Sequence, residues 1–206
     1  MNLVRPGAPR LVLASGSAAR RRLLAAAGLV FEVVVRPVDE EAIRTAMRAQ
    51  GADAAATARL LAESKARAVA AGLAGETLVV GGDQILDCEG EWLEKPGDPA
   101  ALRTQLLRLR GRAHRLVTAA VLLRNGAPVW ETVAGARLVM RPFSDAFLER
   151  YLAVEGPRVL GCVGGYRLEG PGIQLFETVE GDPFAIQGLP LLPLLAALRR
   201  EGVLVE

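Results

Sequence analysis

The stretch LVLASGSAARRRLL, residues 11–24, decides the fold because it changes from strand to helix within a few residues. The apolar segment Arg10–Ala14 predicts a buried strand, and a small-residue turn then leads into a helix that Ser17 can cap. Three successive arginines, residues 20–22, lie in the first turn of this helix, where the helix dipole disfavours positive charge. A bound phosphate would remove the conflict, since backbone amides, hydroxyls and a guanidinium all suit it. An exposed basic patch beside an ordinary serine cap is the alternative.

Strand and helix signals alternate along the rest of the chain, which favours an α/β class over a helical bundle. Strands are predicted at residues 10–14, 31–35, 77–80, 85–88, 91–93, 116–123, 129–140, 159–163 and 173–179. Helices are predicted at residues 18–27, 53–71, 99–109 and 145–154, and after Pro190. Long hairpins among alternating elements predict a mixed central sheet flanked by helices. We expect a single domain over residues 1–206, with no internal repeat or linker to divide it.

Composition excludes several classes of protein. Hydrophobic residues make up 51% of the chain and charged residues 23%, which is typical of a globular protein and not of a disordered one. A net charge of +2 is too small to indicate a stable nucleic-acid partner. Cys88 and Cys162 have neither metal-ligand spacing nor the pattern of a disulfide framework. With no apolar run of membrane-spanning length, the expected location is the cytoplasm, with no membrane partner.

Asp83 is the strongest candidate for a catalytic carboxylate. The strand predicted at 77–80 would end in Gly81-Gly82-Asp83, which places the acid at a sheet edge with room for a ligand against the backbone. An aspartate there could hold a divalent cation or activate a water, or it could simply satisfy the amides of a turn. Asp39-Glu40-Glu41 is a second acidic group, for which a role in starting a helix is the main alternative.

Two lysines could add positive charge to such a site. Lys65 lies on the apolar stripe of its helix with Leu61 and Val69, so it either snorkels to the edge of the core or points into a site that holds negative charge. Lys95 lies on a loop constrained by proline and could reach the same region, or it could be an ordinary surface lysine. His114 is the only histidine, so a histidine-rich metal site or a serine–histidine–aspartate triad is disfavoured and a structural role is expected.

In order and spacing, these pieces resemble the Maf family. The matching segments are LASGS (13–17), RRRLL (20–24), VDE (38–40), LAESKA (61–66), VGGDQ (80–84), KP (95–96), GYRLEG (165–170) and GLPL (188–191). The resemblance implies a hydrolase, a nucleoside triphosphate pyrophosphatase that releases a nucleoside monophosphate and pyrophosphate with Mg²⁺ or Mn²⁺. It also implies an elongated, two-lobed fold related to the inosine-triphosphate pyrophosphatases, with the site in a cleft, and links to nucleotide-pool cleaning and cell-division arrest.

Roles carried over from the family fall on individual residues of this chain. Asp83 would be the proton acceptor for the attacking water, and Glu40 would support the metal or the base; whether Asp83 is a base or a metal ligand stays open. The triphosphate would be bound by Ser15, Arg20, Lys65 and Lys95.

Three further positions bear on the nucleobase. Gln84 and Glu169 resemble the family branch of 7-methyl-GTP pyrophosphatases, not the branch that acts on dTTP and UTP. Ala19 departs from that branch, which often has a tryptophan there, and the missing stacking surface is worth ~1–3 kcal/mol. A glutamate could still select a base with N–H donors.

Two rival functions are a dTTP/UTP pyrophosphatase and a non-enzymatic nucleotide- or DNA-binding regulator of division. The long hairpin offers a surface for a homodimer.

Overall fold

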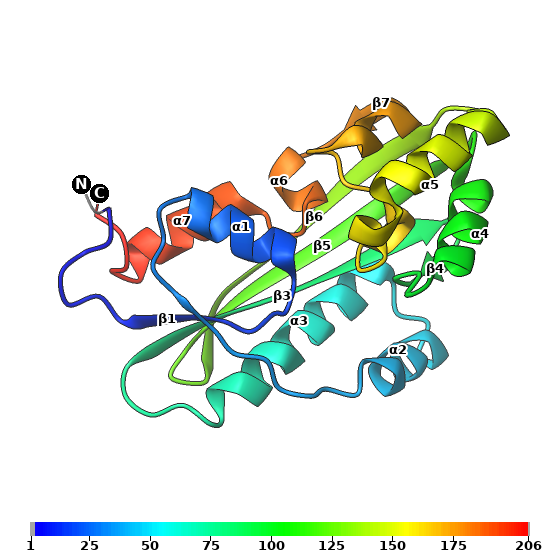
Figure 1. The fold of residues 1–206 in the computed structure, drawn as a ribbon. Helices are drawn as coiled ribbons and strands as arrows, with labels where there is room; N and C mark the ends of the chain where they lie inside the picture. The colour runs from blue at the N-terminus through cyan, green and yellow to red at the C-terminus, as the bar shows by residue number, and fades with distance from the viewer. Residues whose placement is uncertain (1–2, 206) are drawn as a thin grey trace. The chain divides into compact units, whose positions relative to one another are not determined.

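The computed structural model describes residues 3–205, and within that range a mixed β-sheet is flanked by helices (Figure 1). Its strands are β1 (Arg10–Leu13), β2 (Glu32–Val33), β3 (Thr77–Cys88), β4 (Glu91–Leu93), β5 (Ala113–Arg124), β6 (Ala127–Met140) and β7 (Phe176–Glu180). Their order is β2-β1-β3-β5-β6-β7, and β4 pairs with the C-terminal part of β3. β1 is parallel to β2 and β3, whereas β4 and β7 are antiparallel to their neighbours. The predicted α/β class with a mixed sheet is confirmed.

The helices predicted at residues 18–27, 53–71, 99–109 and 145–154 and after Pro190 are confirmed, whereas the helix Pro183–Ile186 was not predicted. The helices are α1 (Ala18–Ala26), α2 (Glu40–Ala49), α3 (Ala54–Ala70), α4 (Pro99–Leu109), α5 (Asp145–Val159), α6 (Pro183–Ile186) and α7 (Leu191–Arg200), with 3₁₀ turns η1 (Val163–Gly165) and η2 (Pro171–Leu175). Side chains of Ser17, Asp53, Asp98 and Ser144 accept hydrogen bonds from the first turns of α1, α3, α4 and α5. These bonds satisfy amides that a helix end otherwise leaves unpaired.

The chain divides into two compact units. Unit 1 comprises residues 3–83, 118–134 and 188–205, and unit 2 comprises residues 84–117 and 135–187. In unit 1, α1 and α7 lie on one face of the strands and α3 lies on the other, with α2 beside it (Figure 1). Its core includes Val12, Leu13 and Val80, none of which has exposed surface.

Unit 2 has its own apolar core beneath α4 and α5. The core includes fully buried leucines of four elements, Leu86, Leu102, Leu106, Leu138 and Leu148. Burying a leucine side chain contributes about 1.5–3 kcal/mol, so these residues are a main source of stability for the unit. Cys88 and Cys162 are both free, in agreement with the absence of a disulfide framework.

The prediction that a strand ends before Gly81-Gly82-Asp83 is wrong. β3 continues without a break from Thr77 to Cys88, so Asp83 lies within a strand and not in a turn after it. Glycines inside a strand often mark places where another part of the chain approaches the backbone closely, and the site described below is such a place.

Three further predicted strands are shorter than expected or absent. β2 keeps only Glu32–Val33 of the predicted 31–35, and residues 173–175 form part of η2 and not of β7. Residues 159–163 were predicted as a strand, but they end α5 and lead into η1. α5 passes through Pro157 and buries Val159 completely, because tertiary packing overrides the local preference of proline to end a helix.

Candidate active site

The turn between β1 and α1 has the predicted geometry. Ser17 Oγ accepts a hydrogen bond of 3.3 Å from the backbone amide of Arg20, and the amide of Ser17 donates to Ser15 Oγ at 3.2 Å. Arg21 and Arg22 are exposed, whereas Arg20 is buried. Only one of the three arginines therefore points into the protein.

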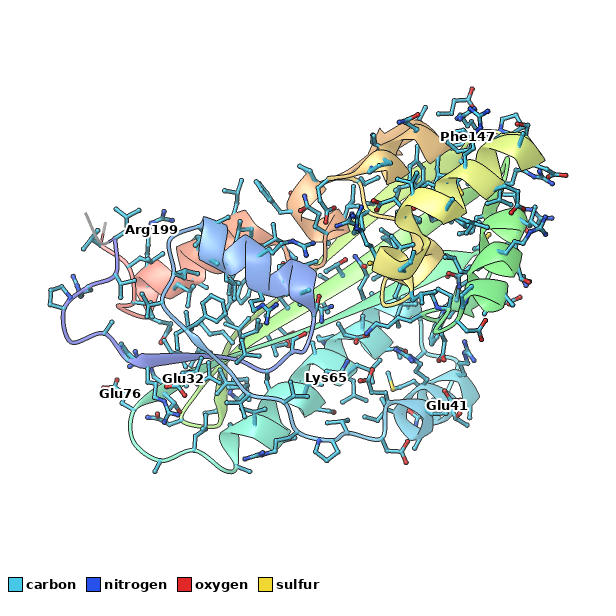
Figure 2. All side chains as sticks on the ribbon, in the orientation of Figure 1. Glu32, Glu41, Lys65, Glu76, Phe147 and Arg199 are labelled. Atoms are coloured by element: carbon cyan, nitrogen blue, oxygen red, sulfur yellow. The ribbon has the colours of Figure 1, made fainter. Side chains whose placement is uncertain are left out.

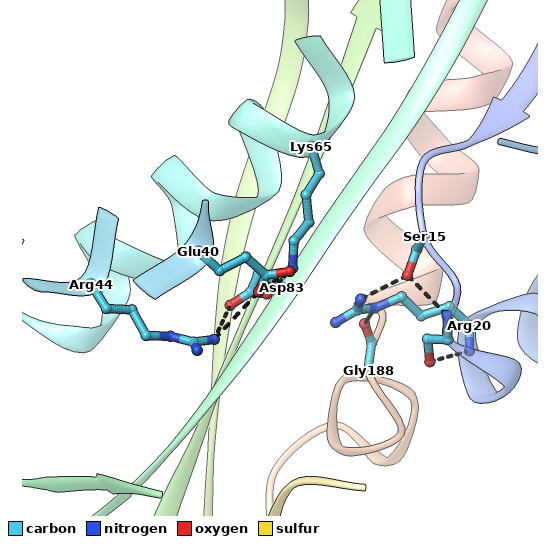
Figure 3. Close-up of polar contacts among 8 residues, drawn as sticks. Ser15, Arg20, Glu40, Arg44, Lys65, Asp83 and Gly188 are labelled. Carbon is cyan, nitrogen blue, oxygen red and sulfur yellow. Dashed lines mark hydrogen bonds and ion pairs between the residues drawn. The ribbon is translucent and has the colours of Figure 1, made fainter. Parts of the chain in front are cut away.

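The Arg20 guanidinium is fixed from two sides, as Figure 3 shows. Its Nε donates to the carbonyl of Gly188 at 2.8 Å, and Nη1 donates to Ser15 Oγ at 3.0 Å. Burial lowers the pKa of Arg20, and the charges of Asp83 and Glu40 act in the opposite direction. Since an arginine keeps its charge in proteins, Arg20 is a fixed, buried cation.

Two glycines of β3 let other parts of unit 1 approach the strand from opposite sides. A Cβ atom on Gly81 would lie 2.2 Å from the carbonyl oxygen of Ala62 on α3. A Cβ atom on Gly82 would lie 3.1 Å from Arg20 Nε. Because successive residues of a strand face opposite sides, Asp83 again faces α3, which carries Lys65.

Lys65 joins two carboxylates of unit 1. Its Nζ lies 2.7 Å from Asp83 Oδ1 and 2.8 Å from Glu40 Oε2. The side chain of Asp83 is only 6% exposed, and that of Lys65 only 17%. Lys65 was expected either to snorkel to the edge of the core or to point into a site that holds negative charge. The structure shows that its ammonium group points at two carboxylates. In Figure 2 Lys65 lies on α3, near α2, which carries Glu41.

The acidic cluster was considered either as the start of a helix or as part of the site. Asp39 has the first role and Glu40 contributes to the second. Asp39 caps α2 by accepting a hydrogen bond of 2.9 Å from the amide of Ala42. Glu40 is the first residue of the helix, and its side chain reaches Lys65. The helix start thus places a carboxylate beside Asp83.

Arg44 is a charged neighbour that the sequence reasoning missed. Its Nη2 lies 3.6 Å from Glu40 Oε2 and 3.9 Å from Asp83 Oδ2. The available signal was its position four residues after Glu40, since such residues share a face of a helix. The group of Glu40, Arg44, Lys65 and Asp83, called the ion cluster below, contains two acids and two bases (Figure 3).

The two carboxylates of the ion cluster suit a divalent cation. Asp83 Oδ2 is buried and has no hydrogen-bond partner in the structure, and Lys65 already shows that Asp83 and Glu40 can bind one cation together. Among residues 3–205, no group of three histidine, cysteine, aspartate or glutamate side chains is suitable for a metal. Two carboxylates nevertheless match the usual coordination of Mg²⁺, which takes its other ligands from phosphates and water.

The remaining predicted site residues do not belong to the ion cluster. Ala19 is half-buried on α1 in unit 1, whereas Gln84, Lys95 and Glu169 lie in unit 2. Gln84 Nε2 donates to the carbonyls of Ala185 and Ile186, at 3.1 and 3.0 Å. Lys95 is exposed between β4 and α4, and Glu169 is exposed between η1 and η2. Their part in a site with Asp83 stays a prediction.

The motifs around the ion cluster agree with a comparison of the whole chain. A family model described as Maf-like protein matches residues 10–201. The chain belongs to the Maf family. This agrees with the resemblance carried by the eight short motifs.

Relatives of this Maf protein carry two names. The nucleoside triphosphate pyrophosphatase of Gluconobacter oxydans is 52% identical over 94% of this chain and 96% of its own length. The protein of the same name from Granulibacter bethesdensis is 50% identical over 95% and 98%. The 7-methyl-GTP pyrophosphatase of Rhizobium meliloti is 46% identical, also over 95% and 98%. Sequence identity to these relatives therefore does not decide which of the two names applies to this chain.

A comparison with solved structures matches the nucleoside-triphosphatase / dITP/XTP pyrophosphatase of Mycobacterium abscessus with 15% identity, 94% coverage of both chains and a TM-score of 0.40. The assignment to the Maf family rests on the sequence comparisons alone. No helix of this Maf protein within residues 3–205 has the length and apolarity that crossing a membrane requires.

Proposed function

We propose that this chain hydrolyses a nucleoside triphosphate between its α- and β-phosphates and releases a nucleoside monophosphate and pyrophosphate. The relatives named as nucleoside triphosphate and 7-methyl-GTP pyrophosphatases support the reaction. The observation that carries the proposal is the buried Asp83, held by Lys65 in the same unit as the buried Arg20. An acid that can take a proton and fixed cations for phosphate are what this hydrolysis requires.

Arg20 and Ser15 form the proposed phosphate anchor. Two donors of Arg20 are already engaged by Ser15 and Gly188, so the side chain is oriented before a substrate arrives. A preorganised cation stabilises the charge of the leaving pyrophosphate without rearranging during the reaction. Lys65 and Lys95 are proposed to add charge, and the flexible stem of a lysine allows its ammonium group to move to a phosphate.

Asp83 is proposed to accept the proton of the attacking water. Lys65 binds Oδ1 at 2.7 Å and so fixes the carboxylate, while Oδ2 accepts no hydrogen bond from residues 3–205 and lies 3.9 Å from Arg44 Nη2. A buried acceptor oxygen without a hydrogen bond favours a water molecule that donates to it. If Asp83 is instead a metal ligand, Asp83 and Glu40 would hold Mg²⁺ or Mn²⁺ together, and the cation would supply positive charge against the phosphates and lower the pKa of a bound water.

The base is proposed to be recognised by Glu169. Glu169 is exposed, and a carboxylate accepts hydrogen bonds from the N–H groups that a methylated guanine presents. We therefore propose 7-methyl-GTP, or another modified purine triphosphate, as the preferred substrate. The reduced stacking expected at Ala19 would weaken this preference without reversing it. A cytoplasmic location, a homodimer and a role in division arrest are predictions of the resemblance alone.

The substitution Asp83→Asn tests the reaction. It keeps the shape of the side chain but removes the proton acceptor, and general-base catalysis contributes roughly 10²–10⁴-fold. We expect kcat for pyrophosphate release to fall by at least about 100-fold, with the circular dichroism spectrum unchanged. Asp87→Asn on the same strand is the matched control, because Asp87 only accepts the amide of Gly90 through Oδ1 and an asparagine can do the same.

The assay uses dTTP, UTP, CTP, GTP and 7-methyl-GTP, each with Mg²⁺ and with Mn²⁺. If Asp83→Asn keeps most of the native kcat, Asp83 is not the catalytic carboxylate. A clear preference of the native protein for dTTP and UTP would contradict the proposed base while leaving the reaction class intact.

A further inference from the structure

Glu155 is a carboxylate with no exposed surface in the interior of unit 2. It lies on α5 and binds two arginines. Arg167 donates to Oε2 through Nε at 3.0 Å and through Nη2 at 2.7 Å. Arg158 donates to Oε1 through Nη1 at 3.2 Å. The side chain of Arg167 is 22% exposed and that of Arg158 is 65% exposed, so the Glu155–Arg167 pair is the inner one.

This pair carries full charges. Desolvation acts to raise the pKa of Glu155, but the hydrogen bonds from Arg167 and Arg158 outweigh it and the pKa is lowered. The hydrogen bond with Glu155 in turn raises the pKa of Arg167, and the charge of Glu169 raises it further. A buried ion pair is often no more stabilising than apolar residues of the same volume. Its presence here therefore favours a role in fixing the conformation of its neighbours.

The neighbour that the pair fixes is the turn that carries Glu169. The amide of Gly170 donates to the carbonyl of Arg167 at 3.3 Å, which makes Glu169 the third residue of a four-residue turn. A Cβ atom on Gly172 would lie 2.5 Å from the carbonyl oxygen of Arg167. A Cβ atom on Gly170 would lie 3.3 Å from Arg167 Nη2 and 3.6 Å from Glu155 Oε2. The backbone that follows Glu169 thus packs on this pair, Gly170 on its charged groups and Gly172 on the backbone of Arg167.

We infer that the Glu155–Arg167 ion pair is a positioning device that holds Glu169 in place to read the nucleobase. This rests on the proposed function, in which Glu169 accepts hydrogen bonds from a purine. Leu168 of this turn packs against the core of unit 2, whereas Glu169 itself is exposed, so the position of its carboxylate depends on how the neighbouring backbone is anchored. Arg167 anchors the first residue of the turn to a helix of the core. Glu155 and Arg167 are positioning residues and touch no substrate.

A double-mutant cycle between Glu155→Gln and Glu169→Ala tests the inference. The readout is discrimination, the ratio of kcat/KM for the preferred nucleotide to that for the poorest one. A hydrogen bond to a charged group is worth roughly 10- to 100-fold. We expect each single variant to reduce discrimination about tenfold, through KM for the preferred nucleotide, with kcat nearly unchanged. Since both changes remove the same contact, the double variant should lose no more than either single one.

Glu149→Gln is the matched control, because Glu149 lies on the same helix but is exposed and pairs with Arg103 at the surface. It should leave discrimination unchanged. If Glu155→Gln does not fold, Arg167→Lys takes its place in the cycle, since it keeps the charge but loses the two-nitrogen contact with Oε2.

The inference is overturned if discrimination survives in the Glu155 variant, if the two losses multiply, or if kcat falls equally for every nucleotide. In each of these cases the native protein still hydrolyses nucleotides, and the proposed function stands. If the native protein hydrolyses no nucleotide at all, the proposed function fails and the inference fails with it.

Discussion

The candidate site depends on two residues without a side chain, Gly81 and Gly82, as well as on its charged residues. Through Gly81 the strand contacts α3, which carries Lys65, and through Gly82 it contacts Arg20. The two contacts differ in kind. The nearest neighbour of Gly81 is the backbone of a helix, at 2.2 Å, whereas the nearest neighbour of Gly82 is the side chain of Arg20, at 3.1 Å. The same substitution should therefore have different effects at the two positions.

Gly81→Ala should destabilise the protein, because its Cβ would lie 2.2 Å from the carbonyl oxygen of Ala62 and the helix must move away. Overpacking of this kind costs about 1–3 kcal/mol or more. Gly82→Ala meets Arg20 Nε at 3.1 Å, Leu189 Cδ2 at 3.4 Å and the carbonyl oxygen of Ala119 at 3.5 Å. These contacts are less severe than that of Gly81, so we expect a smaller loss of stability, and a KM for nucleotide raised several-fold because Arg20 has to shift.

Thermal unfolding and steady-state kinetics on both variants give the comparison. Equal losses of stability at the two glycines would contradict the distinction between the close backbone contact of Gly81 and the looser contacts of Gly82.

At this scale the sequence named most members of the site but not their contacts. Ser15, Lys65 and Asp83 could be picked out by residue type and by the element they follow. The choice of Arg20 over its two neighbours came from the family resemblance, and the carbonyl of Gly188 that fixes it could not be foreseen. Arg44 was missed because its contact with Asp83 depends on how α2 packs, which local sequence does not determine.

At the scale of elements, periodicity predicted the helices and hairpins better than the irregular segments. α3, α4 and the hairpin of β5 and β6 lie where their caps and the Asn125-Gly126 turn place them. Residues 159–163 have the composition of a strand, yet Val159 is buried as part of a helix. A short apolar run is ambiguous between strand and buried helix, and only the tertiary environment decides.

β5 also carries the single histidine, which serves as an internal probe of unit 2. His114 Nε2 lies 2.8 Å from the hydroxyl of Tyr166, and the ring packs near Tyr166 and Phe176. Burial lowers the pKa of His114 to about 4. The location in a buried aromatic cluster agrees with the structural role expected for this residue.

His114 should make stability depend on pH between about 4 and 6.5. The unfolded chain binds a proton near the ordinary histidine pKa of 6.5, whereas the folded protein does so only near 4, so the unfolded state holds more protons in this range. The free energy of unfolding therefore falls as the pH falls from 6.5 to 4, by roughly 2–3 kcal/mol from this residue. Above pH 6.5 it contributes no further change.

Urea denaturation of the native protein and of His114→Gln across this range measures the contribution. In the variant, the free energy of unfolding should change less steeply with pH, because the proton that His114 binds no longer contributes. Identical slopes would mean that the histidine is not buried in its neutral form.

For the molecule as a whole, thermal unfolding reports on metal binding without any assay of activity. A ligand at 100 times its dissociation constant stabilises the folded state by about 2.7 kcal/mol, which raises Tm by about 5–10 °C for a chain of this length. We expect Mn²⁺ to raise the Tm of the native protein and to do so much less in Glu40→Gln.

Glu41→Gln is the control for this measurement, since Glu41 is the next residue of α2 and contacts Thr45 instead of Lys65. A shift of the same size in Glu40→Gln as in the native protein would remove Glu40 from the metal site.

The sequence was also sufficient for the class of the whole molecule, because ordered motifs spread over residues 11 to about 200 identify the family. How the chain divides into two units could not be predicted. Unit 1 takes three separate segments of the chain and unit 2 takes two, and such long-range grouping leaves no local signal.

The hydrogen bond between Arg20 and the carbonyl of Gly188 joins residues 168 positions apart, which has a consequence for synthesis. A chain is made from its N-terminus, and contacts between distant residues are the last to be available to it. Gly188 is added to the growing chain 168 residues after Arg20. The hydrogen bond that fixes Arg20 therefore cannot form until the chain has been made as far as Gly188, and the proposed phosphate anchor is complete only then.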